Sequence, residues 1–269
     1  MSNTTTEYLA VKAGMFAGRN ALQNALTRAN QARGSWKTGT SLNTSKLVKT
    51  YVSVMSGKVN DDRFKRSWIA PEVTASLAVM VDISGSMDGS IGRRKPSKLQ
   101  DMTLSAYALS EVLSRIGVEV NVGYADYEDR PDRQGYRPVI YPLIEGGKPL
   151  VPLADALRIG SLGGTDMISY AWAAVETAEQ SQAYYRLAVY MTDGMDSGSA
   201  PYLRSVAEQA ARSGITLMGV VYATEREIPS ISEHPNGVRV TDPSAFGKVV
   251  MNRLAEAVNA GGKVCEGEG

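Results

Sequence analysis

The chain has 269 residues, 43% of them hydrophobic, and its 29 Lys and Arg residues nearly balance 28 Asp and Glu residues. This length suits one large α/β domain with an extension, and the formal net charge of +1 gives no sign of disorder, nucleic-acid binding or membrane binding. No stretch has the pattern of a signal peptide or a membrane span, and the single cysteine, Cys265, excludes an internal disulfide, so the sequence favours a cytoplasmic protein.

The first 70 residues are expected to form a helical extension. Apolar residues recur near helical spacing over residues 8–32, and a second helix is predicted at 43–57. Residues 61–68 are typical of an extended segment that leads into the main domain. The pattern therefore predicts an extension at 1–70, an α/β domain at 71–262 and a flexible tail at 263–269.

Strand and helix patterns alternate beyond residue 70. The predicted strands are at 77–82, 118–124, 139–144 (an edge strand), 187–192, 215–222 and 238–241. The predicted helices are at 98–116, 152–159, 167–179, 201–213 and 243–260, and residues 125–138 are expected to be a surface loop. This alternation predicts an α/β fold with a doubly wound, mostly parallel sheet and helices on both faces.

Side chains that carry oxygen follow three points in this pattern. Asp82, Ser84 and Ser86 end a buried apolar run, Thr165 follows a Gly-Gly pair before a helix, and Asp193 ends a second buried strand. Because the carboxyl ends of parallel strands meet at one edge of a sheet, the three loops are expected to converge. Oxygen ligands suit a hard cation such as Mg²⁺. Taken alone, the two serines are equally typical of turn and N-cap residues.

Together the three segments resemble a known family. Asp-x-Ser-x-Ser at Asp82, Gly-Gly-Thr-Asp around Thr165 and Met-Thr-Asp-Gly around Asp193 resemble a von Willebrand factor A (vWA) domain with its metal-ion-dependent adhesion site. In that family the serines and the threonine contact the metal directly or through water, and the acids complete the shell. The resemblance implies that Asp82, Ser84, Ser86, Thr165 and Asp193 hold Mg²⁺, or Mn²⁺ or Ca²⁺, with one position open for an acidic residue of a partner.

A narrower resemblance concerns the partner. Residues 47–49, 63–66, 81–87 and 117–124 are similar to the carboxy-terminal part of the vWA subunit of aerobic cobaltochelatase, and the likeness spans roughly residues 43–260. Such proteins pair with a MoxR-type AAA+ ATPase ring, which the resemblance implies as the partner. Arg93, Arg94 and Lys95 lie in a basic insert after the first metal loop. They are either part of the surface that meets an acidic ligand or an ordinary solvated loop.

Several catalytic patterns are missing from the sequence. Each Gly-Lys pair is followed by Val or Pro, so there is no P-loop, and no Gly-x-Ser-x-Gly motif occurs. The only histidine, His234, precedes a proline in a loop and is expected to be exposed and inert. We therefore expect a non-catalytic Mg²⁺-binding adaptor for a MoxR-type ATPase or another acidic protein, with no nucleic-acid or membrane partner. The alternative is a self-assembling or structural protein that uses the same site between chains.

Overall fold

The computed structural model describes residues 2–30, 33–36, 41–42, 64–67, 74–89, 96–129, 136–194, 200–223 and 234–264. The predicted helix at 43–57 and the basic residues 93–95 lie outside these ranges. Two units are defined by the contacts within the chain. One comprises residues 1–23 and 74–257, and the other comprises residues 24–73 and 258–269. The unit that holds the large sheet thus includes residues 1–23, which the sequence pattern places in the extension.

A seven-stranded sheet forms the centre of the first unit, in the order β10-β9-β8-β4-β5-β6-β7. The first five of these strands are parallel, and β6 and β7 are antiparallel to their neighbours. Every residue of the central strand β4 is buried, as its apolar sequence predicts. The strands are β4 (Ala75–Asp82), β5 (Glu119–Asp129), β6 (Tyr136–Glu145), β7 (Lys148–Pro149), β8 (Tyr185–Thr192), β9 (Ile215–Tyr222) and β10 (Val238–Val240).

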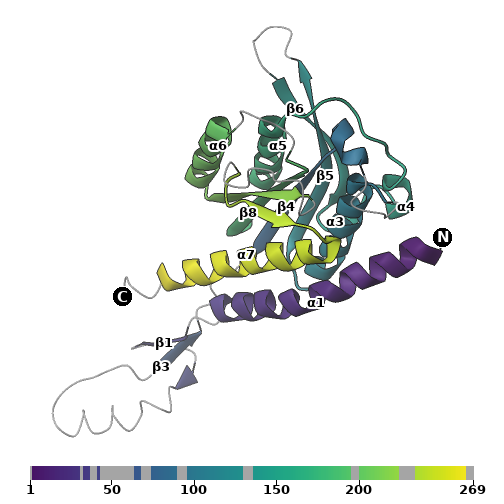
Figure 1. The fold of residues 1–269 in the computed structure, drawn as a ribbon. Coiled ribbons are helices and arrows are strands. Elements are labelled where there is room, and N and C mark those ends of the chain that lie inside the picture. The colour runs from purple at the N-terminus through teal and green to yellow at the C-terminus, as the bar shows by residue number, and fades with distance from the viewer. Residues whose placement is uncertain are drawn as a thin grey trace, which may run out of the picture. The chain divides into compact units, whose positions relative to one another are not determined.

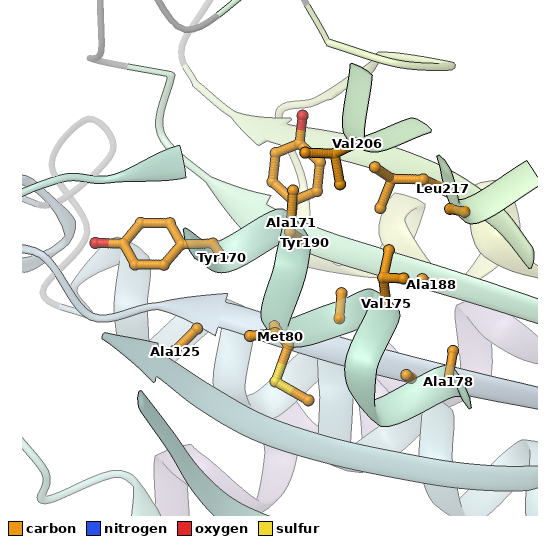
Figure 2. Close-up of a cluster of buried hydrophobic side chains, with 14 of the residues drawn as sticks. Met80, Ala125, Tyr170, Ala171, Val175, Ala178, Ala188, Tyr190, Val206 and Leu217 are labelled. Carbon is orange, nitrogen blue, oxygen red and sulfur yellow. The ribbon is translucent and has the colours of Figure 1, made fainter. Parts of the chain in front are cut away.

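Helices cover both faces of this sheet, which confirms the predicted fold class (Figure 1). On one face, α5 packs against alternate β4 residues, Ala78 and Met80, and Figure 2 shows the small side chains of α5 that allow this close approach. On the same face, α6 packs against β9. On the other face lies α3, whose Thr103 shares a hydrogen bond of 2.8 Å with Tyr124 of β5. The helices are α3 (Lys98–Ser114), α4 (Leu153–Ala156), α5 (Met167–Glu179), α6 (Ala200–Arg212) and α7 (Pro243–Val264).

The predicted surface loop at 125–138 is wrong over residues 125–129, which continue β5, and over 136–138, which begin β6, because the two strands form a hairpin there. The two arms carry exposed charged residues, such as Glu128 of β5 and Arg137 of β6, which form an ion pair across the hairpin, so their sequence lacks the apolar pattern of a core strand. The edge strand predicted at 139–144 lies within β6, and β7 extends the sheet beyond it only at Ile144 and Glu145. Pro142 of β6 lies opposite Gly123, next to the register shift of this pair.

The long helix α1 (Ser2–Asn30) begins the chain, and its first part packs within the sheet-bearing unit. Met15 is fully buried against Gly247 of α7, and Tyr8 and Lys12 both bind Glu111 of α3. Within the described ranges, every helix is too short or too polar to span a lipid bilayer.

The second unit contains a small antiparallel sheet in which β3 (Phe64–Ser67) pairs with both β1 (Arg33–Trp36) and β2 (Ser41–Leu42). Within the extended segment predicted at 61–68, residues 64–67 therefore form a strand.

Candidate metal centre

Two neighbouring parallel strands bring the acids of the predicted site together. Asp82 is the last residue of β4, and Asp193 directly follows β8, which pairs with β4 in register. Thr192 at the end of β8 donates a hydrogen bond of 2.9 Å from Oγ1 to Asp82 Oδ2. The backbone N–H of Ser84 donates to the other carboxylate oxygen at 2.7 Å. The strand ends therefore fix the Asp82 carboxylate from two sides.

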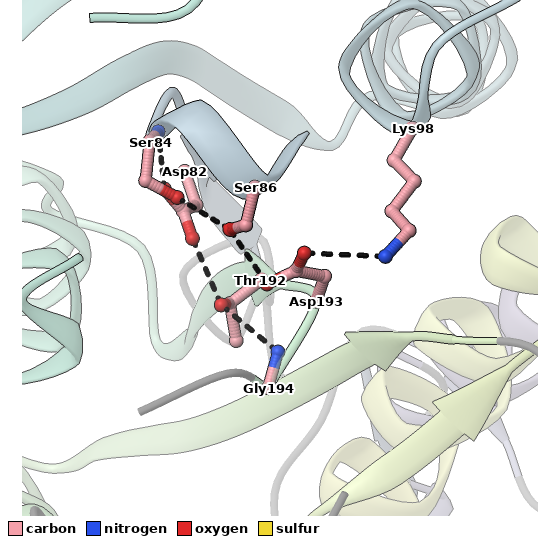
Figure 3. Close-up of polar contacts among 7 residues, drawn as sticks. All are labelled: Asp82, Ser84, Ser86, Lys98, Thr192, Asp193 and Gly194. Carbon is pink, nitrogen blue, oxygen red and sulfur yellow. Dashed lines mark hydrogen bonds and ion pairs between the residues drawn. The ribbon is translucent and has the colours of Figure 1, made fainter. Parts of the chain in front are cut away.

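A single 3-10 turn, η1 (Gly85–Asp88), presents the two serines. Met87 is fully buried, and its N–H donates to the Ser84 carbonyl at 3.0 Å, which anchors the turn on the core. Ser84 Oγ and Ser86 Oγ are 3.1 Å apart, and Ser86 Oγ donates to Asp193 Oδ1 at 3.0 Å (Figure 3). Four of the five predicted residues thus form one cluster linked by hydrogen bonds.

The oxygen spacing in this cluster fits a small octahedral cation. Neighbouring ligands around Mg²⁺, at bond lengths of about 2.1 Å, are about 3.0 Å apart. The separations of Ser86 Oγ from Ser84 Oγ and from Asp193 Oδ1, 3.1 and 3.0 Å, match this value. In the described part of the chain, no three or more His, Cys, Asp or Glu side chains form a group that could hold a metal, so a cation here depends on hydroxyl ligands. The donor set is all oxygen, which suits Mg²⁺ and excludes a soft-metal site.

The loop that carries Thr165 is bound to the serine loop through its backbone. Leu162 N–H donates to the Ile83 carbonyl at 2.6 Å, and Gly85 N–H donates to the Gly163 carbonyl at 3.3 Å. Thr165 follows two residues later and is half-buried. Asp166 then caps α5 by accepting hydrogen bonds from Ile168 N–H and Ser169 Oγ, at 3.2 and 2.6 Å. Thr165 thus lies between two fixed points, in a loop that is bound to the serine loop.

The electrostatics of Asp82 favour a cation nearby. Burial raises the pKa of Asp82 from its ordinary value of 3.8 to about 6, against the hydrogen bonds from Ser84 and Thr192, and the charge of Asp193 adds to the increase. Burial, together with the Asp82 charge, also raises the pKa of Tyr170, whose hydroxyl donates to the Gly164 carbonyl at 2.9 Å. Two ionised acids buried at the same edge of the sheet destabilise the folded state unless a positive charge compensates them.

Two residues of the cluster were not predicted from the sequence. Thr192 could have been found, because the residue before Asp193 on a parallel neighbour of β4 must lie beside Asp82. Lys98 forms a buried ion pair with Asp193, with Nζ 3.2 Å from Oδ2 (Figure 3). The clue in the sequence is the position of Lys98 in the first turn of a helix, where the helix dipole disfavours a positive charge.

The expected exposure of His234 is wrong, because its side chain is buried. Its Nδ1 lies 2.9 Å from the hydroxyl of Tyr190, and the loop packs on β9 through a hydrogen bond from Gly219 N–H to the Pro235 carbonyl. A Cβ atom at Gly219 would lie 2.8 Å from His234 Cβ, so this glycine makes room for the histidine. The burial comes from tertiary packing, which no local pattern reports. The partner-binding residues Arg93, Arg94 and Lys95 lie outside the described residues, so their role stays a prediction.

No protein-family model matches the sequence, and no curated protein matches it. Solved structures similar to the chain include BatB from Bacteroides thetaiotaomicron, at 17% identity and a TM-score of 0.46 over 68% of this chain and 98% of that chain. The SpRpn10 vWA domain is similar at 10% identity and a TM-score of 0.44, covering 64% of this chain and 85% of that one. A von Willebrand factor type A protein from Catenulispora acidiphila is similar at 19% identity and a TM-score of 0.41, over 70% of this chain and 43% of that chain. Because these identities are below 20% and the TM-scores below 0.5, the fold class rests on the strand order and helices of this chain itself.

Proposed function

We propose that this chain is a vWA-type adaptor that binds an acidic protein partner through a divalent cation, most suitably Mg²⁺. The observation that supports the proposal is the hydrogen-bonded cluster of Asp82, Ser84, Ser86 and Asp193 at the carboxyl edge of the sheet, with the Thr165 loop bound beside it. The three sequence segments of the vWA resemblance supply all of these residues.

The side chains divide into two groups by charge. Ser84, Ser86 and Thr165 offer neutral hydroxyl oxygens, and Asp82 and Asp193 offer carboxylates that are held by their own hydrogen bonds. A divalent ion with few anionic ligands keeps part of its charge and attracts a further carboxylate. A Glu or Asp side chain of the partner would supply that carboxylate, so binding of the partner would require the metal.

The proposed partner is a MoxR-type AAA+ ATPase, or a target of that ATPase, in the cytoplasm. This choice rests on the resemblance to the vWA subunit of aerobic cobaltochelatase. The chain has no P-loop of its own, so nucleotide hydrolysis would belong to the partner. We propose a non-catalytic role, in which the chain links the ATPase to its substrate.

The proposal is tested by pull-down of a purified MoxR-type ATPase from the source organism, in Mg²⁺ and in EDTA. We expect recovery with the wild-type chain in Mg²⁺ only, and loss of recovery with Asp82→Ala, because this variant removes a carboxylate from the centre. Glu208→Ala, at an exposed position of α6, is the matched control and should bind like the wild type. Circular dichroism checks that both variants fold.

Equal recovery in Mg²⁺ and EDTA would refute the adaptor proposal. A rise in the mass of the purified chain with Mg²⁺ alone, measured by light scattering, would instead favour contacts between copies of this chain.

A further inference from the structure

Lys98 stands out among the residues around the centre because its position is unfavourable for a cation. It is the first residue of α3, directly after Ser97, whose side chain and Gln100 form a capping box. A positive charge in the first helical turn opposes the helix dipole, and burial adds a desolvation cost. The Lys98 and Asp193 side chains are only 6% and 0% exposed. A lysine in such a place needs a specific acid beside it.

Asp193 supplies that acid and is divided between the lysine and the serine turn. Its Oδ1 accepts the hydrogen bond from Ser86 Oγ, and its Oδ2 lies 3.2 Å from Lys98 Nζ. The backbone also ties the lysine to the turn, because Lys98 N–H donates to the Gly89 carbonyl at 2.8 Å. The ammonium group is therefore held in contact with a proposed metal ligand by both its side chain and its backbone.

We propose that Lys98 is a tethered counter-cation of the metal centre that lowers the affinity of the centre for divalent ions. This inference rests on the proposed function, because it assigns Lys98 a role toward the same ion. With both acids ionised, Asp82, Asp193 and Lys98 together carry one negative charge, whereas the two acids alone carry two. An incoming divalent ion meets less negative charge and is repelled by a fixed ammonium group nearby.

The same charge balance affects the loaded centre. With a divalent ion in place, the two acids alone would leave the centre neutral, whereas the centre with Lys98 has one positive charge in excess. A carboxylate from the partner neutralises this excess in a site with little water, where charge interactions are strong. Lys98 thus makes the metal weakly held without a partner and more firmly held with one, which is a positive coupling between the two ligands.

The experiment is a calorimetric titration of MgCl₂ into the full chain and four variants. Lys98→Gln removes the charge but keeps a hydrogen-bond donor for Asp193, and Lys98→Met removes both. Lys98→Arg keeps the charge as the matched control, and Asp82→Ala reports whether the ion binds at this centre. We expect Lys98→Gln and Lys98→Met to bind Mg²⁺ about tenfold more tightly than the wild type, a difference of about 1.4 kcal/mol, and Lys98→Arg to bind like the wild type.

A structural role for Lys98 would give a different result. If Lys98 only supported the fold, its removal would lower the melting temperature without tightening Mg²⁺ binding. Because Lys98→Met leaves Asp193 buried without this partner, its folding is checked by thermal denaturation with and without Mg²⁺. The gain in melting temperature from Mg²⁺ should be larger in this variant than in the wild type.

The outcomes separate the two proposals. Unchanged Mg²⁺ affinity in Lys98→Gln, together with wild-type binding that Asp82→Ala abolishes, would overturn the role of Lys98 and leave the metal centre standing. Binding by Lys98→Gln but not by the wild type would support the role in its strongest form. No binding in any of these proteins would overturn both proposals.

Discussion

Asp82 shows how its environment, and not only its residue type, defines this centre. The carboxylate is fully buried, and each of its oxygens accepts one hydrogen bond, from Ser84 N–H and from Thr192 Oγ1. These bonds favour the charged form, but burial has the larger effect and the pKa rises to about 6. Without a metal ion, the folded state therefore holds a proton on Asp82 more tightly than the unfolded state does.

This difference predicts how the stability of the metal-free protein depends on pH. Because the folded pKa of Asp82 is above the unfolded value of 3.8, protonation favours the folded state. The Asp82 contribution to the free energy of unfolding should fall as pH rises from about 4 to about 6, by at most about 3 kcal/mol, and then stay constant. Urea denaturation in EDTA, compared between the wild type and Asp82→Asn, isolates this contribution from those of other acids. A difference between the two proteins that does not vary between pH 4 and pH 7 would contradict the assignment.

The loops of the centre are shaped by contacts that exclude larger side chains. Gly163 has a left-handed backbone conformation, with φ of +67°, and its carbonyl accepts the hydrogen bond from the serine loop. At Gly164, a Cβ atom would lie 2.7 Å from the hydroxyl oxygen of Tyr127, closer than any ordinary contact. Thr165 follows directly in the same loop.

Replacement of Gly164 by alanine should therefore weaken metal binding without unfolding the protein. Either the loop or the Tyr127 ring must shift to make room. We expect the loop to shift and displace Thr165, which should lower Mg²⁺ affinity about tenfold, since a loss of about 1.4 kcal/mol is typical of one impaired contact. Gly160→Ala is the control, because nothing lies within 4 Å of a Cβ atom at that position. Calorimetry measures both. Equal affinities for the two variants would show that the position of Thr165 is not important for the ion.

Across the whole molecule, the sequence predicts most where structure follows from local periodicity. The buried strand β4 and the helices α3, α5 and α6 are close to their predicted bounds, and the predicted α/β class with a mostly parallel sheet is confirmed. The polar arms of the hairpin formed by β5 and β6 were missed, because exposed charged residues there resemble a loop.

Contacts between distant residues were the least predictable part of the site. Lys98 and Asp193 are 95 residues apart, and no short motif joins them. The burial of His234 against Tyr190 is of the same kind, since it depends on a loop that packs on β9. By contrast, Asp82, Ser84, Ser86 and Asp193 could be assigned to one place, because parallel strands order their carboxyl ends along one edge.

The metal centre is tested most directly by a crystal structure of the chain grown with Mn²⁺, with anomalous diffraction used to locate the ion. We expect one strong anomalous peak at the carboxyl edge of β4, within about 2.3 Å of the Ser84 and Ser86 hydroxyl oxygens and near Thr165. No peak should remain in Asp82→Ala. An ion bound only elsewhere, or the same peak in Asp82→Ala, would show that these loops do not form one metal centre.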